Sequence, residues 1–381
     1  MQVIGVICEY NPLHLGHKKQ LDLLRQGDPD CGIVCLMSGN YVQRGMPAIL
    51  DKTLRAKAAM ACGADLVLEL PLVYSLSSAE GFAAGGVSLL KNICDKLCFG
   101  AENPEPEALM STARALLSEE FKPILRRYLE EGLSFPAARQ KALEEMGLDG
   151  SILSAPNNIL AVEYCKAILA QEADLIPCPI YRAGDYHDSK PDPENPSATA
   201  IRQQMLAGEA WQAYVPEAAR EIFSLCRLHS LDAGQRGILA RLRTMTEAEF
   251  EALPYGSEGL WRKLMHAARQ EATLEDILTA VKSKRYTRTR LDRMVMCAFL
   301  GLTRQDMESP APYARVLALN EKGRKILKDA RLSGLFPNTG EDTGHPYQKI
   351  EQRAEDLYGL FALDAPSPAG AERKRRIFYQ P

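Results

Sequence analysis

The chain has 381 residues, of which 46% are hydrophobic, and a formal net charge of -3 at pH 7. This length and composition are typical of a globular protein with a substantial core and room for two or three domains. The small net charge excludes a global attraction to nucleic acid or to an anionic membrane, so any such binding must come from a local basic surface. No apolar run approaches the roughly 20 residues that span a bilayer, so neither secretion nor membrane insertion is indicated.

The ten cysteines lie mostly in apolar segments, where reduced core thiols are expected. The pairs Cys31/Cys35 and Cys94/Cys98 each have three residues between them, but no nearby histidine completes a tetrahedral metal site. The cysteines therefore predict a cytoplasmic protein with buried thiols and no bound structural metal.

The first hundred residues alternate short apolar runs with helical patterns, as in a parallel sheet covered by helices. We expect strands at 3–8, 32–37, 65–69 and 96–99, with helices near 17–26, 51–62 and 78–92. The predicted fold is a doubly wound α/β unit. In such sheets ligands bind beyond the carboxyl ends of the strands, and this sequence places polar or turn-forming loops there, at 11–17, 38–45, 70–71 and 100–102.

The pattern is more helical after this unit. Residues 105–148 are expected to be helical, a further helix begins at 154–158, and a strand is expected at 174–180. A polar loop at 182–188 and a Pro-rich exposed loop at 189–196 precede another helix. The sheet unit is expected to close near residue 210, and the rest is mainly helical, with a strand-like run at 313–319.

The turn after the first expected strand carries His14, Gly16 and His17 in an HxGH pattern. Gly16 lets the backbone approach a phosphate closely, and two imidazoles at a helix N-terminus can donate to phosphate oxygens. Such donors stabilise charge that grows on a phosphorus under attack. The alternative is that both histidines are turn residues, caps or metal ligands, and four residues alone do not decide between these interpretations.

A second group comprises Ser197, Thr199 and Arg202. It offers two hydroxyls at a helix start and a cation about one turn later, a set that suits the β- and γ-phosphates of a nucleotide. The alternative is a plain N-cap with a solvated arginine. In combination with the histidine motif, phosphate binding is the better interpretation.

Together the two motifs resemble those of the adenylyl- and cytidylyltransferase superfamily, whose second motif usually begins Ile-Ser where this chain has Pro196-Ser197. Over nearly the whole chain the sequence resembles the tRNA(Met) cytidine acetate ligase family. That family usually has Phe and Asn where this chain has Leu13 and Leu15, which changes packing but leaves both imidazoles. The resemblance rests on EYNPLHLGH at 9–17, MSGNYVQRG at 37–45, GADLVLELP at 63–71, FGAE at 99–102, PNN at 156–158 and KRYTRTR at 284–290.

The resemblance implies a nucleotidyltransferase-like ATP-binding domain over residues 1–210, followed by a mainly helical tRNA-binding region over residues 211–381. It implies an enzyme that activates acetate with ATP, accompanied by Mg²⁺, to acetyl-adenylate. The enzyme would then acetylate N4 of the wobble cytidine in elongator methionine tRNA.

Within this expected enzyme, His14 and His17 are assigned to transition-state stabilisation. Asp51 and Lys52 are candidates for substrate contact, although helix capping and solvated charge explain them equally well. The expected ATP contacts, of which the last three come from the hydroxyl and arginine pattern, are Ile7, Cys8, Glu9, Tyr10, Asn11, Pro12, Leu13, His14, Leu15, Gly16, His17, Lys18, Lys19, Gln20, Gly100, Asn157, Arg182, Ser197, Thr199 and Arg202.

The densest basic stretch covers residues 282–293, with six Lys or Arg in twelve positions. It suits contacts to a tRNA backbone, with an interleaved tyrosine as a stacking platform; a solvated helix face is the alternative. A second cluster at 373–376 either assists binding or is a soluble tail. The residues assigned to nucleic-acid binding are Lys282, Lys284, Arg285, Tyr286, Arg288, Arg290 and Arg293.

Two other functions compete with this one. A small-molecule adenylyl- or cytidylyltransferase would share the ATP motifs but would not require the basic stretch or the additional helical half. A nucleotide-sensing or RNA-binding protein with an inactive pocket would not require both histidines and Arg202.

Overall fold

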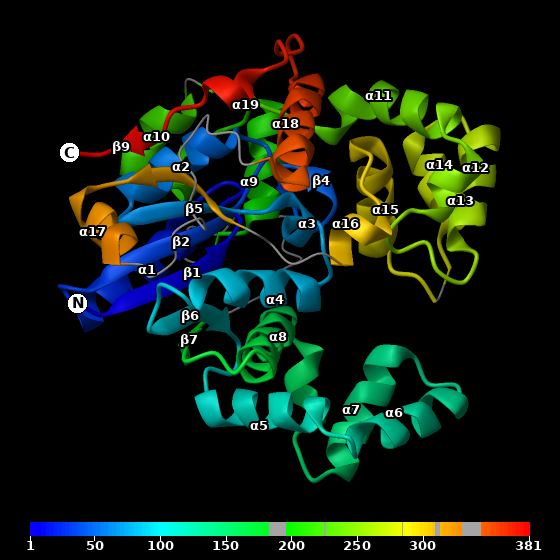
Figure 1. Ribbon diagram of the computed structural model, residues 1–381, viewed down its shortest axis with the longest axis horizontal. Coiled ribbons are helices and arrows are strands. Elements are labelled where there is room, and N and C mark those ends of the chain that lie inside the picture. Colours follow the sequence, from blue (N-terminus) through cyan, green and yellow to red (C-terminus); the bar gives the residue numbers. More distant parts are fainter. Residues whose placement is uncertain (183–195, 225, 284, 309–312, 330–343) are drawn as a thin grey trace.

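The computed structural model describes residues 1–182, 196–224, 226–283, 285–308, 313–329 and 344–381 (Figure 1). At its centre is a seven-stranded sheet in the order β7-β6-β1-β2-β5-β8-β9. Five strands are parallel: β1 (Val3–Cys8), β2 (Gly32–Ser38), β5 (Leu66–Leu70), β6 (Lys96–Ala101) and β7 (Ile176–Tyr181). The sheet is extended by β8 (Arg315–Leu319), antiparallel to β5, and by the short β9 (Phe378–Tyr379).

The central parallel strands are mostly apolar because helices cover both faces of the sheet. In β2, Val34 and Leu36 pack on one face, whereas Ile33 and Cys35 pack on the other. The first face is covered by α4 (Ala79–Leu90) and α8 (Pro156–Ala170). The second is covered by α1 (Leu15–Gly27), α2 (Lys52–Ala61), α9 (Ala198–Ala207) and α10 (Glu217–Ser224). The predicted doubly wound fold is confirmed.

The strand order reverses between β1 and β6. The chain moves outward from β1 to β2 and β5, and then returns to add β6 on the other side of β1. Ligands of doubly wound sheets bind in the crevice at such a reversal. The loops that follow β1 and β6 therefore meet where a nucleotide is expected.

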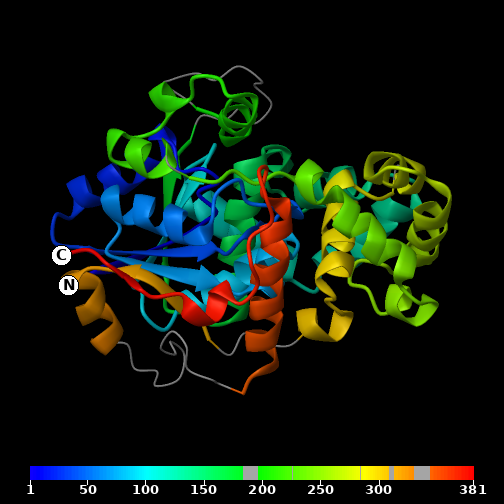
Figure 2. The ribbon, with the colours of Figure 1, turned by 90° about the horizontal axis from the view of Figure 1, so that it is seen from above.

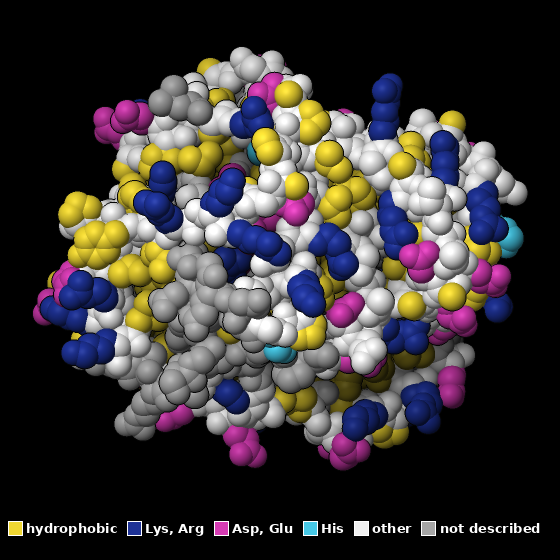
Figure 3. Space-filling view, turned by 45° about the horizontal axis from the view of Figure 1, so that its top comes forward, with side chains coloured by type: hydrophobic (Ala, Val, Ile, Leu, Met, Phe, Trp, Pro, Cys, Tyr) yellow, Lys and Arg dark blue, Asp and Glu magenta, His cyan; other side chains and the backbone are white. Residues whose placement is uncertain are grey.

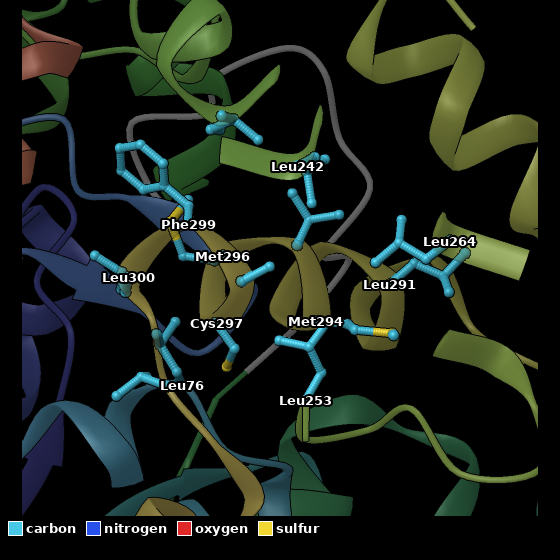
Figure 4. Close-up of a cluster of buried hydrophobic side chains, with 14 of the residues drawn as sticks. Leu76, Leu242, Leu253, Leu264, Leu291, Met294, Met296, Cys297, Phe299 and Leu300 are labelled. Atoms are coloured by element: carbon cyan, nitrogen blue, oxygen red, sulfur yellow. The ribbon is translucent and has the colours of Figure 1, made fainter. Parts of the chain in front are cut away.

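A group of helices packs beside the carboxyl end of the sheet (Figures 1 and 2). Its central member is α15 (Arg288–Leu300), whose Leu291, Met294 and Cys297 point into a cluster with Leu242 and Leu253 (Figure 4). The cluster also contains residues of α3 (Leu72–Ser75), so this group is continuous with the sheet. Its other helices are α11 (Leu231–Thr244), α12 (Glu247–Glu251), α13 (Leu260–Gln270), α14 (Leu274–Val281) and α16 (Arg304–Glu308).

A second group of helices packs on α8 and comprises α5 (Pro106–Leu117), α6 (Phe121–Glu130) and α7 (Phe135–Glu145). The last part of the chain returns to the sheet through α17 (Glu321–Asp329), α18 (Pro346–Tyr358) and α19 (Ala371–Lys374). Single 3-10 turns lie at Gly150–Ser154, Gln212–Tyr214 and Gly359–Phe361.

The structure contains elements that the sequence pattern does not indicate. A short hairpin of β3 (Tyr41–Val42) and β4 (Met46–Pro47) follows β2. The region after residue 210 is mainly helical as expected and supplies β8 within the strand-like run expected at 313–319, whereas the short β9 is not indicated by the sequence pattern. Two-residue strands have no detectable period, and pairing partners are chosen by tertiary packing. The division at residue 210 stays a prediction.

Most of the polar loop at 182–188 and of the Pro-rich loop at 189–196 lies outside the described residues, which resume at Pro196.

All ten cysteines are free thiols. Within the described segments, no helix combines the length and apolarity needed to cross a membrane.

Candidate active site

A pocket of about 290 Å³ opens beyond the carboxyl ends of β1 and β6. Its walls come from the loops after β1, β2, β6 and β7, from α4 and α8, and from the first turn of α9. The fold thus brings together segments that are far apart in the sequence, such as Asn11 and Arg202. The residues expected to bind ATP that line it are Ile7, Cys8, Glu9, Tyr10, Asn11, His17, Gln20, Gly100, Asn157, Arg182, Ser197, Thr199 and Arg202.

The other residues of segment 7–20 do not line this wall. Leu13 is fully buried in the core beneath the loop. Lys18 pairs with Asp22 on the same helix. The remaining members of this set are Pro12, His14, Leu15, Gly16 and Lys19, of which His14 lies directly behind the pocket wall because its ring stacks on that of His17.

His14 and His17 together cap the N-terminus of α1. Nδ1 of His14 accepts a hydrogen bond from the Gly16 amide at 3.1 Å, and Nδ1 of His17 accepts one from the His14 amide at 3.3 Å. The two rings stack with their centroids 3.7 Å apart. A ring nitrogen that accepts a hydrogen bond carries no proton, so the proton of each neutral ring resides on Nε2. Each histidine is therefore a hydrogen-bond donor at Nε2.

The Nε2 of His14 is buried and has no hydrogen-bond partner among the described residues. Such a donor is costly unless a ligand accepts its proton. Burial lowers the pKa of His14 from 6.5 to about 3, and the cations Arg182 and Arg202 act in the same direction. Burial, His14 and Arg182 also hold the pKa of His17 well below its usual value. Both rings are thus neutral at pH 7, and the positive charge comes from the arginines.

We expect neither imidazole to titrate between about pH 8 and pH 5 in the ligand-free protein, since both folded-state pKa values lie below the usual range. At His14 the unfolded chain binds more protons than the folded chain between pH 6.5 and about 3. The free energy of unfolding therefore decreases as the pH falls through that window. Imidazole C–H resonances followed by NMR test the expectation. A midpoint near 6.5 for either ring would contradict it.

Arg202 joins the start of α9 to the loop after β1. It donates to the carbonyl oxygen of Asn11 at 2.7 Å and to the hydroxyl of Thr199 at 3.0 Å. It is therefore not a plain solvated arginine. On the other wall, Arg182 follows β7 and packs over Gly100, where a Cβ would lie 3.0 Å from Arg182 Cδ. Glycine at position 100 leaves room for this arginine beside the pocket.

Glu102 is a site residue that the sequence motifs do not by themselves indicate. Its carboxylate accepts hydrogen bonds from the Asn157 amide at 3.2 Å, from Asn157 Nδ2 at 2.6 Å and from the Asn158 amide at 2.7 Å. It therefore caps α8 and orients Asn157 at the pocket wall. The signal was an acidic residue directly after a strand end, within the FGAE segment.

Arg55 is a second residue that supports the site and that the sequence pattern does not indicate. Its guanidinium is fully buried and donates to the carbonyl oxygens of Glu9 at 2.6 Å and Ser38 at 3.1 Å. It thereby ties the loop after β1 to the loop after β2. Position 55 lies within an ordinary helical pattern, so only the tertiary structure shows its role.

Asp51 and Lys52 do not line the pocket. Asp51 caps α2 by accepting from the Thr53 amide at 2.7 Å, and Lys52 is buried against Glu69 at 2.7 Å. Capping therefore explains Asp51, burial contradicts a solvated charge for Lys52, and neither side chain lines the pocket. Lys52 is instead part of a buried ion network.

The basic stretch at 282–293 lies at the start of α15 and in the turn before it. Arg285 pairs with Glu258 at 2.7 Å and Arg288 pairs with Glu275 at 2.6 Å, both at the surface. An exposed single pair contributes little stability, so Arg285 can exchange its carboxylate for a phosphate at small cost. Arg288 is held more firmly, because it also donates to Asp292 at 2.9 Å. Lys282 is exposed, and Lys284 lies outside the described residues.

Three other members of this stretch face the protein. Tyr286 is only 6% exposed, its hydroxyl donates to Glu258 at 3.1 Å, and the guanidinium of Arg290 packs against its ring. The expectation that this ring offers a stacking platform is therefore wrong, because the ring faces are covered by the protein. Arg290 donates to the carbonyl oxygen of Tyr255 at 2.9 Å, and Arg293 donates to that of Gln43 at 3.2 Å.

The second basic cluster, at 373–376, is divided in the same way. Arg375 is buried in the ion network with Asp51 and Glu372, whereas Arg373, Lys374 and Arg376 are wholly or partly exposed. The face that carries α18 and α19 shows Lys and Arg side chains across its middle (Figure 3). Part of this cluster is therefore structural rather than a soluble tail.

In the described parts of the chain, no three His, Cys, Asp or Glu side chains are arranged to hold a metal ion. The cations that line the pocket are arginines. The expectation that Mg²⁺ accompanies the ATP phosphates stays a prediction.

Residues 1–372 match the family model described as HIGH Nucleotidyl Transferase. The tRNA(Met) cytidine acetate ligase of Clostridium novyi (strain NT) is 38% identical over 357 residues, covering 88% of this chain and 89% of that protein. The chain belongs to the tRNA(Met) cytidine acetate ligase family. The family's protein from Clostridium acetobutylicum is 36% identical, with 88% and 89% of the two chains covered.

Solved structures agree with this family membership. The crystal structure of Thermotoga maritima TmcAL bound with alpha-thio ATP superposes with a TM-score of 0.87 at 29% identity, covering 100% of both chains. The apo form I of the same protein superposes with a TM-score of 0.88 over the same coverage. The Thermotoga protein and this chain therefore share the same overall fold over their whole lengths.

Proposed function

We propose that this chain activates acetate with ATP to acetyl-adenylate and then acetylates N4 of the wobble cytidine of elongator methionine tRNA. The observation that carries the proposal is the pair of neutral histidines whose Nε2 atoms are donors at the strand reversal, beside Arg182 and Arg202. The names of the family members support the same reaction. A nucleotide analogue bound to the Thermotoga protein supports ATP as the substrate.

The first half-reaction needs no enzymic nucleophile. An acetate oxygen forms a bond to the α-phosphorus while the bond to the bridging oxygen of pyrophosphate breaks. The Nε2–H groups of His14 and His17 donate to the phosphate oxygens as charge develops, and the arginines neutralise the leaving group. Mg²⁺ bound to the ATP phosphates would add further charge neutralisation.

The second half-reaction transfers the acetyl group to RNA. The cytidine amine attacks the acetyl carbonyl carbon, AMP leaves with the bridging oxygen, and the amine loses a proton. Because the adenylate stays in the pocket, the cytidine base must enter its mouth while the RNA backbone remains outside.

The decisive assay combines the protein with ATP, acetate and methionine tRNA, followed by nucleoside mass spectrometry for N4-acetylcytidine. Exchange of pyrophosphate into ATP should require acetate. Exchange that is independent of acetate would reject the ligase function. Turnover with a small alcohol or phosphate acceptor in place of tRNA would favour the alternative small-molecule transferase.

The exposed cations of the basic stretch give a separate test. Replacing Lys282, Arg285 and Arg288 with glutamine should weaken tRNA binding about tenfold or more and reduce the slope of log affinity against log salt by about 2 to 3. Acetate-dependent exchange should fall far less. The matched control is Arg114→Gln, an exposed arginine paired with Glu107 on α5. Equal loss of exchange and of tRNA binding would contradict an RNA-contact role.

A further inference from the structure

The β3–β4 hairpin forms the wall of the pocket on the side of β2. Val42, Gln43, Arg44 and Met46 all line the pocket. The hairpin follows β2, whereas Arg182 follows β7, and these two strands lie on opposite sides of β1. The hairpin and Arg182 therefore face the ATP site from opposite sides of β1.

Hydrogen bonds join the hairpin to the ATP-binding loop and to α15 at the same residue. The Gln43 amide donates to the Glu9 carboxylate at 2.8 Å, and its carbonyl oxygen accepts from Arg293 of α15 at 3.2 Å. The Tyr41 hydroxyl donates to the carbonyl oxygen of Ala354 at 3.0 Å. The hairpin is thus held in place from three directions.

Gly45 brings the hairpin backbone directly against α15. It has a φ of +79°, and a Cβ at this position would lie 2.4 Å from the backbone nitrogen of Arg293 and 2.5 Å from the carbonyl carbon of Asp292. Only glycine combines this conformation with so close an approach. The first turns of α15, which carry part of the basic stretch, therefore abut the pocket wall (Figure 1).

We propose that Arg44 binds a backbone phosphate of the RNA nucleotide that presents its base to the pocket, and that Arg293 is a positioning residue that holds the hairpin without touching RNA. The inference rests on the proposed function. Arg44 is exposed and yet lines the pocket. It therefore lies at the mouth, where a bound nucleotide would have its backbone outside the pocket and its base inside. A guanidinium presents two parallel donors that match a phosphate.

Charge and position favour an RNA phosphate over acetate as the partner of Arg44. RNA that contacts Arg285 and Arg288 at the start of α15 reaches the pocket across the hairpin, because Gly45 and Arg293 hold these two elements in contact. The acetate must instead lie in line with the α-phosphorus, inside the pocket. An exposed arginine at the mouth is better suited to the larger anion.

The test compares Arg44→Gln with Arg44→Lys in the full chain. For Arg44→Gln we expect kcat/KM for tRNA to fall about tenfold or more, several times further than acetate-dependent exchange falls, and the salt slope of tRNA binding to decrease by about 1. Arg44→Lys should recover part of the loss. A tenfold rise in KM for acetate during exchange would assign Arg44 to acetate and overturn the inference, as would unchanged tRNA kinetics.

Arg293 is tested by the same two readouts. Both Arg293→Lys and Arg293→Gln should lower exchange and RNA acetylation in parallel, with the salt slope of tRNA binding unchanged, because the hairpin moves but no phosphate contact is lost. A reduced salt slope would show that Arg293 contacts RNA. If the wild-type chain lacks acetate-dependent exchange, the proposed function fails, whereas the effect of Arg44→Gln on the salt slope still decides whether Arg44 contacts RNA.

Discussion

Replacing His14 with asparagine is expected to reduce acetate-dependent pyrophosphate exchange by about 10²- to 10³-fold while leaving the protein folded. Asparagine is a strong N-cap residue, and its side-chain oxygen can accept the Gly16 amide hydrogen bond that Nδ1 of His14 accepts at 3.1 Å. It has no group at the position of Nε2. The variant thus removes the donor to the phosphate and retains the cap of α1.

His14→Ala is the matched control, because it removes both the donor and the cap. We expect the same loss of exchange together with a decrease of about 1 kcal/mol in the free energy of unfolding. Exchange kinetics and denaturant unfolding, measured on both variants, separate the two roles. Exchange by His14→Asn within a few fold of wild type would show that Nε2–H does not stabilise the transition state.

The largest expected effect on stability comes from Lys52→Met, at about 3–5 kcal/mol. The Lys52 side chain is 2% exposed, and its Nζ lies 2.7 Å from Glu69 and 3.1 Å from Glu372. Its removal would leave buried carboxylates without their cation. The exposed pair Lys122–Glu119 provides the control, since Lys122→Met should change the free energy of unfolding by about 0.5 kcal/mol or less.

The network around Lys52 explains why the cost should be high. Burial opposes ionisation of Glu372, but Lys52, Arg315 and Arg375 lower its pKa to about 2. The stabilisation from this group is present above its ordinary pKa of 4.5 and is lost as the pH falls toward 2. Urea unfolding of Lys52→Met and wild type at neutral pH measures the effect. A loss of less than about 1 kcal/mol would show that the cluster compensates for the missing cation.

The central parallel strands were predictable because burial on both faces leaves a mostly apolar run. The β1 bounds agree with the prediction, and those of the other parallel strands differ by at most two residues at either end. The β3–β4 hairpin was not predictable, because two-residue strands have no period. Its motif, MSGNYVQRG, was visible as a family segment, but its contact with α15 was not.

What followed from sequence was the local chemistry: an apolar strand, a turn with two histidines at a helix start, and hydroxyls with an arginine one turn later. These depend on spacing within a few residues, which the chain itself dictates. Only the tertiary structure decided which cations are available. Arg285 remains at the surface, whereas Arg293 and Arg375 are held by Gln43 and Asp51. Their partners lie hundreds of positions away, so no local pattern can distinguish a surface arginine from one that holds the pocket wall in place.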